Sequence, residues 1–511
     1  MALEARTLNA KRNIAWGAAS KVVLMLLPFF IRTIFIYTIG LEYLGLSSLY
    51  TSLLQILSLA ELGFATAVVY SLYKPLAEND TEMVCAIMAF LKYTYYCVGV
   101  LILVLGLTAS AFLPHFIHGD VPDDINIYYL FYIYLLNTVI SYFFAGYKSA
   151  LLTANQRDDI KSKVITVVNI AQYVLQGIVL LLFKDFYLYV TVLPLATLSI
   201  NALNAYFTKR YFPQYVAKGT LSQEQVRPMI KQIGGLFISR ICAVSRNSVT
   251  NILISSFIGL LTLAVYSNYV YVETSIQGML TIVGASILAG VGNSIVKESE
   301  EKNYSDFKKF NFIYMWISGW CFCCLVNLFQ PFITLWVGEK STMQYSTVLL
   351  LCLVFYFTTA GDMRNTYINA TGIWWQNRWR PILEASTNLL LSFLLIKQFQ
   401  VSGVLVATLI SLVFVNLWFG SRVLYSEYFK TQKFSDFIKA HLTYFIISCL
   451  AAFLTYLCCS LVKSGSLLGL LLRLVFCMII PNVVYFVFYY RKNEFKESVQ
   501  FIKRFVVRKK A

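Results

Sequence analysis

The sequence is poor in charged residues and in histidine. Of its 511 residues only 13% are charged, and there are three histidines. No GxxxxGK[ST] motif for binding nucleotide phosphates occurs, and no soluble stretch is long enough for an ATPase domain. No Ser/His/Asp set or carboxylate pair lies at a catalytic spacing. We therefore expect a protein that is not an enzyme, with transport driven by gradients.

Cysteine pairs with a zinc or disulfide spacing are also missing. The eleven cysteines are scattered mainly within apolar runs, where cysteine is usually a small apolar residue. His115 and His118 have HxxH spacing near Asp120, but a loop at a membrane interface explains them better than a metal site. The sequence thus predicts neither a metal nor another cofactor.

Apolar residues dominate instead. The hydrophobic fraction is 58% and the aromatic fraction 16%, which is typical of an all-α polytopic membrane protein. The net charge of +17 does not indicate nucleic-acid binding, because the basic residues fall almost wholly in short gaps between apolar runs.

Fourteen apolar runs are long enough to span a bilayer as helices, for which about 20 residues suffice. They are 13–39, 44–72, 83–111, 127–152, 163–183, 187–208, 231–257, 259–295, 309–336, 345–370, 380–397, 402–422, 438–461 and 466–490.

The basic residues indicate the orientation of these spans. With a cytoplasmic N-terminus, 31 of the 42 lysines and arginines lie in or beside the inner segments, 4 lie in outer loops and 7 lie within spans. Such a bias follows the positive-inside rule and predicts that both termini are cytoplasmic.

The chain is predicted to have two six-helix lobes followed by an extra helix pair. An N-terminal lobe (1–209) and a C-terminal lobe (231–430) are separated by a cytoplasmic linker (210–230), and the pair (431–490) is followed by a basic tail (491–511). The pairs Ser20-Lys21 and Ser239-Arg240 begin the first and seventh spans alike, as in the duplicated halves of many transporters. Phe495 lies on an apolar face of the tail, which we expect to lie on the anionic inner leaflet.

Basic residues within the spans are the main candidates for a binding site. Arg240 and Arg246 lie near the middle of the seventh span, and Asn247 shares a helix face with Arg240. Lys21 lies at a similar depth in the first span, while Arg32 approaches the outer interface. Such cations either tie helices together or form a wall for an anionic substrate such as a diphosphate.

Acidic residues within the spans are fewer. Glu61, Glu273 and Asp362 can each neutralise a cation, bind a coupling H⁺ or Na⁺, or do both. Glu384 follows Pro381 at the start of a span and is expected to be structural. Lys92, among tyrosines, is expected either to line a cavity or to extend toward the interface.

Several stretches resemble the Wzx-type polysaccharide-biosynthesis flippases of the multidrug/oligosaccharidyl-lipid/polysaccharide superfamily. They are GLEYLGLSSLYTSLLQILSLAELGFATAVVYSLYKPLAEND, VYSNYVYVETSIQGMLTIVGASILAGVGNSIVKES, PFITLWVG and TGIWWQNRWRPILEASTNLLLSF. The resemblance covers most of the chain up to about residue 430.

The resemblance implies an alternating-access transporter with two lobes around a cationic central cavity. Its relatives move undecaprenyl-diphosphate-linked oligosaccharides from the inner to the outer leaflet of the bacterial cytoplasmic membrane, which predicts a lipid-linked glycan and membrane lipids as partners. Lys21, Arg32, Arg240 and Arg246 lie on the two helices that line the cavity in that family. The extra pair, 438–490, resembles that of the lipid II flippase, whose two helices form a groove for the polyprenyl tail. Polymerases or glycosyltransferases are further expected partners.

The alternative is an ion-coupled multidrug exporter of the same fold. A site for cationic drugs would show uncompensated carboxylates and few central cations, whereas seven basic residues within the spans face three acidic ones. A membrane-embedded glycosyltransferase would need a large outer loop with catalytic acids, and the longest outer loop, 114–126, is short.

Overall fold

The computed structural model describes residues 2–61, 64–119, 121–227, 244, 248–462 and 465–507. The regular elements in these ranges are all helices, with no strand among them. Internal contacts divide the chain into two compact units, unit 1 (Met1–Ala264) and unit 2 (Val265–Ala511). The linker and domain boundaries expected from the sequence stay a prediction.

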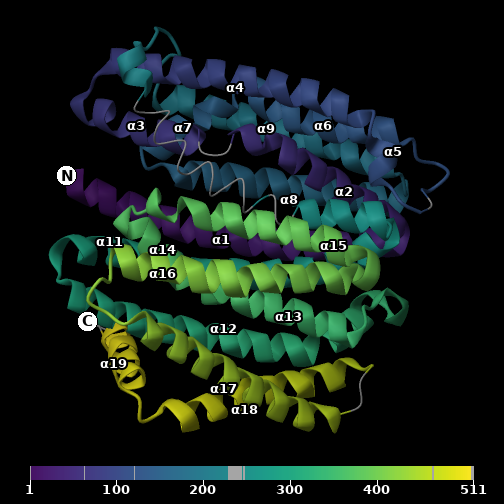
Figure 1. Ribbon diagram of the computed structural model, residues 1–511. Helices are drawn as coiled ribbons and strands as arrows, with labels where there is room; N and C mark the ends of the chain where they lie inside the picture. The colour runs from purple at the N-terminus through teal and green to yellow at the C-terminus, as the bar shows by residue number, and fades with distance from the viewer. Residues whose placement is uncertain are drawn as a thin grey trace. The chain divides into compact units, whose positions relative to one another are not determined.

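Long helices lie side by side within unit 1 (Figure 1). Its elements are α1 (Ala2–Thr38), α2 (Leu41–Leu57), η1 (Ser58–Glu61), α3 (Phe64–Glu78), α4 (Thr81–Ser110), α5 (Leu113–Phe116), α6 (Ile127–Phe143), η2 (Gly146–Lys148), α7 (Ser149–Ala154), α8 (Asp158–Leu182) and α9 (Phe186–Tyr211). In packing order, α1 contacts α8, α8 contacts α9, α9 contacts α6, and α6 contacts α4.

Unit 2 is built in the same way. Its elements are α11 (Leu260–Lys297), α12 (Glu300–Val337), η3 (Glu339–Ser341), α13 (Tyr345–Ala360), α14 (Asp362–Thr371), η4 (Gln376–Arg378), α15 (Trp379–Ile410), η5 (Ser411–Phe419), α16 (Gly420–Glu427), α17 (Phe434–Ser460), α18 (Leu467–Tyr489) and α19 (Asn493–Val507). The first residues of α11 belong to unit 1. In unit 2, α12 packs against α13, α17 and α18, and α15 packs against η5.

Polar side chains mark the starts of several helices. Asp80 accepts a hydrogen bond from the backbone N–H of Met83 (2.9 Å), and Asp185 accepts one from Leu188 (2.9 Å). Ser466 does the same for Gly469 at the start of α18. These caps satisfy backbone donors that the first turn of a helix leaves without partners.

The helix of one predicted span is interrupted by a non-helical residue or turn in each unit. Ala145, between α6 and η2, has a left-handed φ of 57°, and Gly361 separates α13 from α14. A second left-handed residue, Gln400 (φ 50°), reverses the chain within α15. Residues on either side of it are hydrogen-bonded, as between Asn388 and Thr408 (2.9 Å), which shows that the two halves form an antiparallel hairpin.

The spans agree with the sequence-based count. By length and hydropathy, eight helices among the described residues can cross a membrane, and the bent pair α6 and η2–α7 makes a ninth. One of the eight, 376–427, contains the reversal at Gln400 and therefore two spans. With α1, α2–α3, the short helix Ser248–Phe257 and α11, the protein is a multi-pass membrane protein with about fourteen transmembrane helices, as predicted.

The extra pair α17–α18 is packed onto α12 through polar contacts as well as rings. Trp316 Nε1 donates to Asn482 Oδ1 (2.9 Å), and Asn327 Nδ2 donates to the carbonyl of Ala452 (3.3 Å). Buried side-chain hydrogen bonds of this kind hold helices together where the hydrophobic effect contributes little. The pair is thus an integral part of unit 2.

The tail forms α19, whose first aromatic residue contacts other helices of unit 2. Phe495 packs against the rings of Phe312 and Trp316 on α12 and of Phe486 on α18. Phe495 is thus half-buried against unit 2, and the expected position of the tail on the inner leaflet stays a prediction.

Candidate functional site

The two predicted cations of the first span both lie on α1. Lys21 is exposed, whereas Arg32 is half-buried and interacts with neighbouring residues. Eleven residues separate them, about 16 Å along a helix. They mark two levels of one helix and cannot both hold a single phosphate.

Part of the predicted site lies beyond what the structure describes. Arg240, Arg246 and Asn247 fall outside the described residues, as does the side chain of Glu61, whose backbone belongs to η1. Their assignment to a substrate site stays a prediction.

Glu273 is buried on α11, with only 7% of its surface exposed, and it interacts with neighbouring residues. One turn earlier, Tyr269 donates a hydrogen bond to Gln330 Oε1 on α12 (2.9 Å) and accepts one from the N–H of Met343 (3.2 Å). A buried carboxyl group needs a partner or a proton. This polar surrounding is compatible with structural pairing and with ion coupling.

Asp362 is the first residue of α14, directly after the break at Gly361. Its Oδ2 accepts a hydrogen bond from the hydroxyl of Tyr314 on α12 (2.6 Å). This bond joins the break to a neighbouring helix, so the carboxylate has a structural partner in unit 2.

Arg364, three residues after the break, is the largest fully buried side chain of the described residues, at 1% exposure. Its guanidinium donates to the backbone carbonyl of Asn416 and, at 2.8 Å, to the side-chain oxygen of Asn416. Gly420 makes room for it, since a Cβ there would lie 2.8 Å from Nη1. Asn416 lies within the π-helical turn η5, a type of turn that often marks a functional site.

A buried ion pair completes this cluster. Arg380 Nη1 donates to Glu384 Oε2 (2.9 Å), and Asn416 Nδ2 donates to the same oxygen (2.6 Å). Glu384 was expected to be structural because of its place at a helix start. It is indeed paired, but in the second turn of α15 and through buried contacts that the sequence did not indicate. We call Arg364, Arg380, Glu384 and Asn416 the buried cluster.

Unit 1 has a related ion pair at the corresponding helix start, with the charges reversed. Asp159, the second residue of α8, is fully buried and accepts a hydrogen bond from Arg157 Nε (2.9 Å), while Lys163 lies 3.7 Å away one turn later. The hydrogen bond that Arg157 donates to Asp159 raises the pKa of Arg157. Here the carboxylate lies at the helix start, where the helix dipole favours a negative charge.

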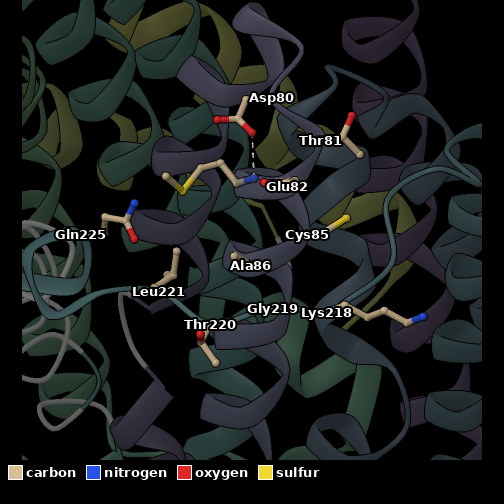
Figure 2. Close-up of a pocket in the computed structure, with 11 residues that line it drawn as sticks. Asp80, Thr81, Glu82, Cys85, Ala86, Lys218, Gly219, Thr220, Leu221 and Gln225 are labelled. Carbon is tan, nitrogen blue, oxygen red and sulfur yellow. Dashed lines mark hydrogen bonds between the residues drawn. The ribbon is translucent and has the colours of Figure 1, made fainter.

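A cleft of 510 Å³ lies at the start of α4 (Figure 2). Its other wall is the chain segment 218–225, and Gly219, with a φ of 95°, lies against Ala86. Asp80 is engaged as the cap of α4, and in Figure 2 the Lys218 side chain extends away from it. The cleft carries charges of both signs and does not form a cationic pocket. The cleft lies between the start of α4 and the segment that follows α9.

An apolar cavity of 270 Å³ lies between α11, α12 and α18. The residues that line it are uncharged and almost wholly aliphatic or aromatic: Val272, Ile276, Cys324, Leu325, Leu328, Phe329, Phe332, Leu470, Leu471 and Leu474. Such a cavity can hold hydrocarbon but offers no polar group for recognition. Among the residues that the structure describes, no group of three or more His, Cys, Asp or Glu is placed to hold a metal ion.

The sequence matches a known family over more than half its length. Residues 10–288 match the family model described as "Polysaccharide biosynthesis protein". The chain belongs to the polysaccharide biosynthesis protein family. The resemblance inferred from the sequence is therefore confirmed. A search of curated proteins gave no match.

Solved structures of a flippase and of multidrug transporters have folds similar to that of this chain. The lipid II flippase MurJ in an inward closed conformation aligns with a TM-score of 0.69 and 14% identity, over 93% of this chain and 99% of its own. An inward-facing multidrug resistance MATE family transporter of the MOP superfamily aligns with a TM-score of 0.64 and 15% identity, over 80% and 96%. MATE in the bent conformation gives 0.54 and 16%, over 82% and 96%. At such identities these likenesses establish the fold.

Proposed function

We propose that this protein is a flippase that moves undecaprenyl-diphosphate-linked oligosaccharides from the cytoplasmic to the outer leaflet of a bacterial inner membrane by alternating access. The observation that carries the proposal is the family match over residues 10–288. The fold supports it, because the similarity to the lipid II flippase includes 93% of the chain, against 80–82% for the two MATE structures.

The residues have the following proposed roles. Lys21, Arg32, Arg240 and Arg246, with Asn247, hold the diphosphate and any acidic sugar, because basic side chains recognise phosphate through charge-assisted hydrogen bonds. Glu61, Glu273 and Asp362 act as charge partners or bind a coupling ion. The polyprenyl tail stays in the bilayer, and the apolar cavity beside α18 offers a place for part of it.

A binding experiment tests this assignment. The thermal unfolding temperature of the purified protein is measured with and without undecaprenyl-diphosphate oligosaccharide. The variants Lys21→Ala and Arg240→Ala are measured in the same way. A ligand at 100 times its Kd stabilises the native state by about 2.7 kcal/mol. We expect both variants to lose most of this gain, while Lys209→Ala, which removes an exposed lysine from the end of α9, keeps it.

The opposite result would favour the multidrug exporter. The MATE structures share the fold, and the buried Glu273 is a carboxylate of the kind that cation transport uses. Stabilisation by lipophilic cations but not by the lipid-linked glycan would support that function and would give the span cations a structural role.

A further inference from the structure

A second cavity in unit 1, of 500 Å³, lies at the break after α6. Its walls come from α4, from the break itself and from α9: Lys92, Tyr96, Phe143, Phe144, Ala145, Tyr147, Lys148, Leu198, Ser199 and Ala202. Two lysines line this cavity and no acidic residue does. Neither lysine has an ion-pair partner among the described residues.

The break that forms the cavity is built into the chain. Ala145 adopts a left-handed φ of 57°, which costs a non-glycine residue about 1–2 kcal/mol. The next residue must be glycine, because a Cβ on Gly146 would lie 2.3 Å from the carbonyl oxygen of Ser141. Strain of this kind persists where the surrounding structure maintains it and is often found at functional sites.

Side chains of α9 satisfy the backbone groups that the break releases. Asn201 Nδ2 donates to the carbonyl of Ser141 (3.4 Å), and the Thr208 hydroxyl lies 3.3 Å from the carbonyl of Lys148. The lysine amines are therefore not needed to satisfy these carbonyls. Both amines are therefore available to a ligand in the cavity.

Both lysines lie in the half of their predicted spans that is nearer the cytoplasmic side. Lys92 lies eleven residues after the start of α4, about 16 Å along the helix, and Lys148 lies six residues before the end of α7, about 9 Å. Both helix ends belong to the predicted cytoplasmic side. Lysine stems extend several ångströms toward the interface, so both amines can turn toward the inner leaflet.

The aromatic residues give the cavity an apolar wall beside its charges. The Lys92 amine lies 5.7 Å from the ring centroid of Tyr96, and that ring stacks on Phe143 at 5.8 Å. Cations and aromatic rings that line the same cavity suit a ligand with an anionic head and a hydrocarbon tail.

We propose that this cavity binds the phosphate of an anionic lipid from the cytoplasmic leaflet, with Lys92 and Lys148 as the binding cations. The proposal concerns unit 1 alone and holds whether the protein transports a lipid-linked glycan or a drug. The phosphate could belong to a membrane phospholipid or to a polyprenyl diphosphate, so the experiment includes both.

The test measures lipid binding to the full-length protein in detergent. Phosphatidylglycerol and undecaprenyl diphosphate are titrated separately, with phosphatidylcholine as the neutral comparison. The variants are Lys92→Gln, Lys148→Gln, the double variant, and Lys209→Gln as a matched loss of one positive charge at the exposed end of α9. Removing one lysine near the surface is expected to weaken anionic-lipid binding about fivefold.

The two lipids distinguish the sources of the phosphate. Weaker binding of phosphatidylglycerol in both single variants identifies a phospholipid site, and the same loss for undecaprenyl diphosphate identifies a site for the lipid carrier. Lys92→Arg keeps the charge and should retain binding, which separates a lost site from a misfolded protein. Equal affinity of the wild type and the double variant for both lipids would overturn the proposal, as would an equal loss in Lys209→Gln.

Discussion

The break at Ala145 in unit 1 opens onto a cavity and bends the span by 49°. At Gly361 in unit 2 the backbone stays helical, and α13 and α14 form one span that contacts α17. Lys148 and Arg364 each lie three residues after their break. Asn201 lies seventeen residues after the left-handed Lys184, and Asn416 lies sixteen residues after the left-handed Gln400. Asn201 binds a carbonyl just before the break, while Asn416 accepts hydrogen bonds from Arg364. The two units thus use equivalent positions for different purposes.

The helix that packs beside α12 and α13 in unit 2 is α17. Its Phe445 contacts Phe357 on α13, and its His441 lies 3.1 Å from Asn311 on α12. Asn311 lies twelve residues after the cap of α12, as Lys92 does in α4. The comparison teaches that an added helix can convert an open, cationic break into a sealed one whose charges are compensated within the protein.

The largest effect should come from removing the carboxylate of the buried cluster. Glu384→Ala takes away the group that Arg380 and Asn416 both contact, so we expect a loss of about 3–5 kcal/mol of unfolding free energy. Equilibrium unfolding in mixed detergent would measure it. Glu78→Ala is the control, because its pair with Lys74 is exposed and is worth at most about 1 kcal/mol. Similar losses for both would show that burial does not set the strength of the cluster.

Substitutions at the two equivalent basic positions sharpen the comparison. Arg364→Met leaves the Asn416 carbonyl without its donor and should cost about 2–3 kcal/mol of unfolding free energy. Lys148→Met, at the open break, should cost less than about 1 kcal/mol. The same unfolding assay checks both, and a reversed order would contradict the distinction between a sealed and an open break.

Adding a methyl group where α12 meets the extra pair should loosen the cover. A Cβ on Gly319 would lie 2.5 Å from Ser448 Oγ and 2.5 Å from the Tyr485 hydroxyl, so Gly319→Ala should cost about 1–3 kcal/mol. Hydrogen exchange should rise in α17 and α18. Gly278→Ala, where no atom lies within 4 Å of the added carbon, should be neutral or stabilising. Unchanged exchange in Gly319→Ala would show that α17 and α18 do not depend on this contact.

A smaller effect than in the buried cluster is expected at the reversed ion pair of unit 1. Asp159→Asn keeps the shape but removes the charge that Arg157 and Lys163 contact, at an expected cost of about 1–2 kcal/mol of unfolding free energy. The cost is smaller than for Glu384→Ala because both cations are partly exposed to water. A loss as large as that of Glu384→Ala would show that the two ion pairs are equivalent after all.

The spans could be predicted from the sequence because the length of an apolar run is a local property. The breaks could not, since the residues after Ala145 and Gly361 were interpreted as continuations of the apolar runs 127–152 and 345–370. The partner of Arg364 is 52 residues away, and no local pattern indicates such a pair. Lys92 was expected to line a cavity or to extend toward the interface, whereas no role was predicted for Lys148.

Translocation itself tests the central claim most directly. Proteoliposomes that contain the protein and a fluorescent undecaprenyl-diphosphate oligosaccharide are exposed to a glycan-cleaving enzyme added outside. The account predicts that the protected inner-leaflet fraction becomes accessible with the wild type and stays protected with Lys21→Ala or Arg240→Ala. A fraction that stays protected with the wild type, in vesicles that do transport lipophilic cations, would contradict the account.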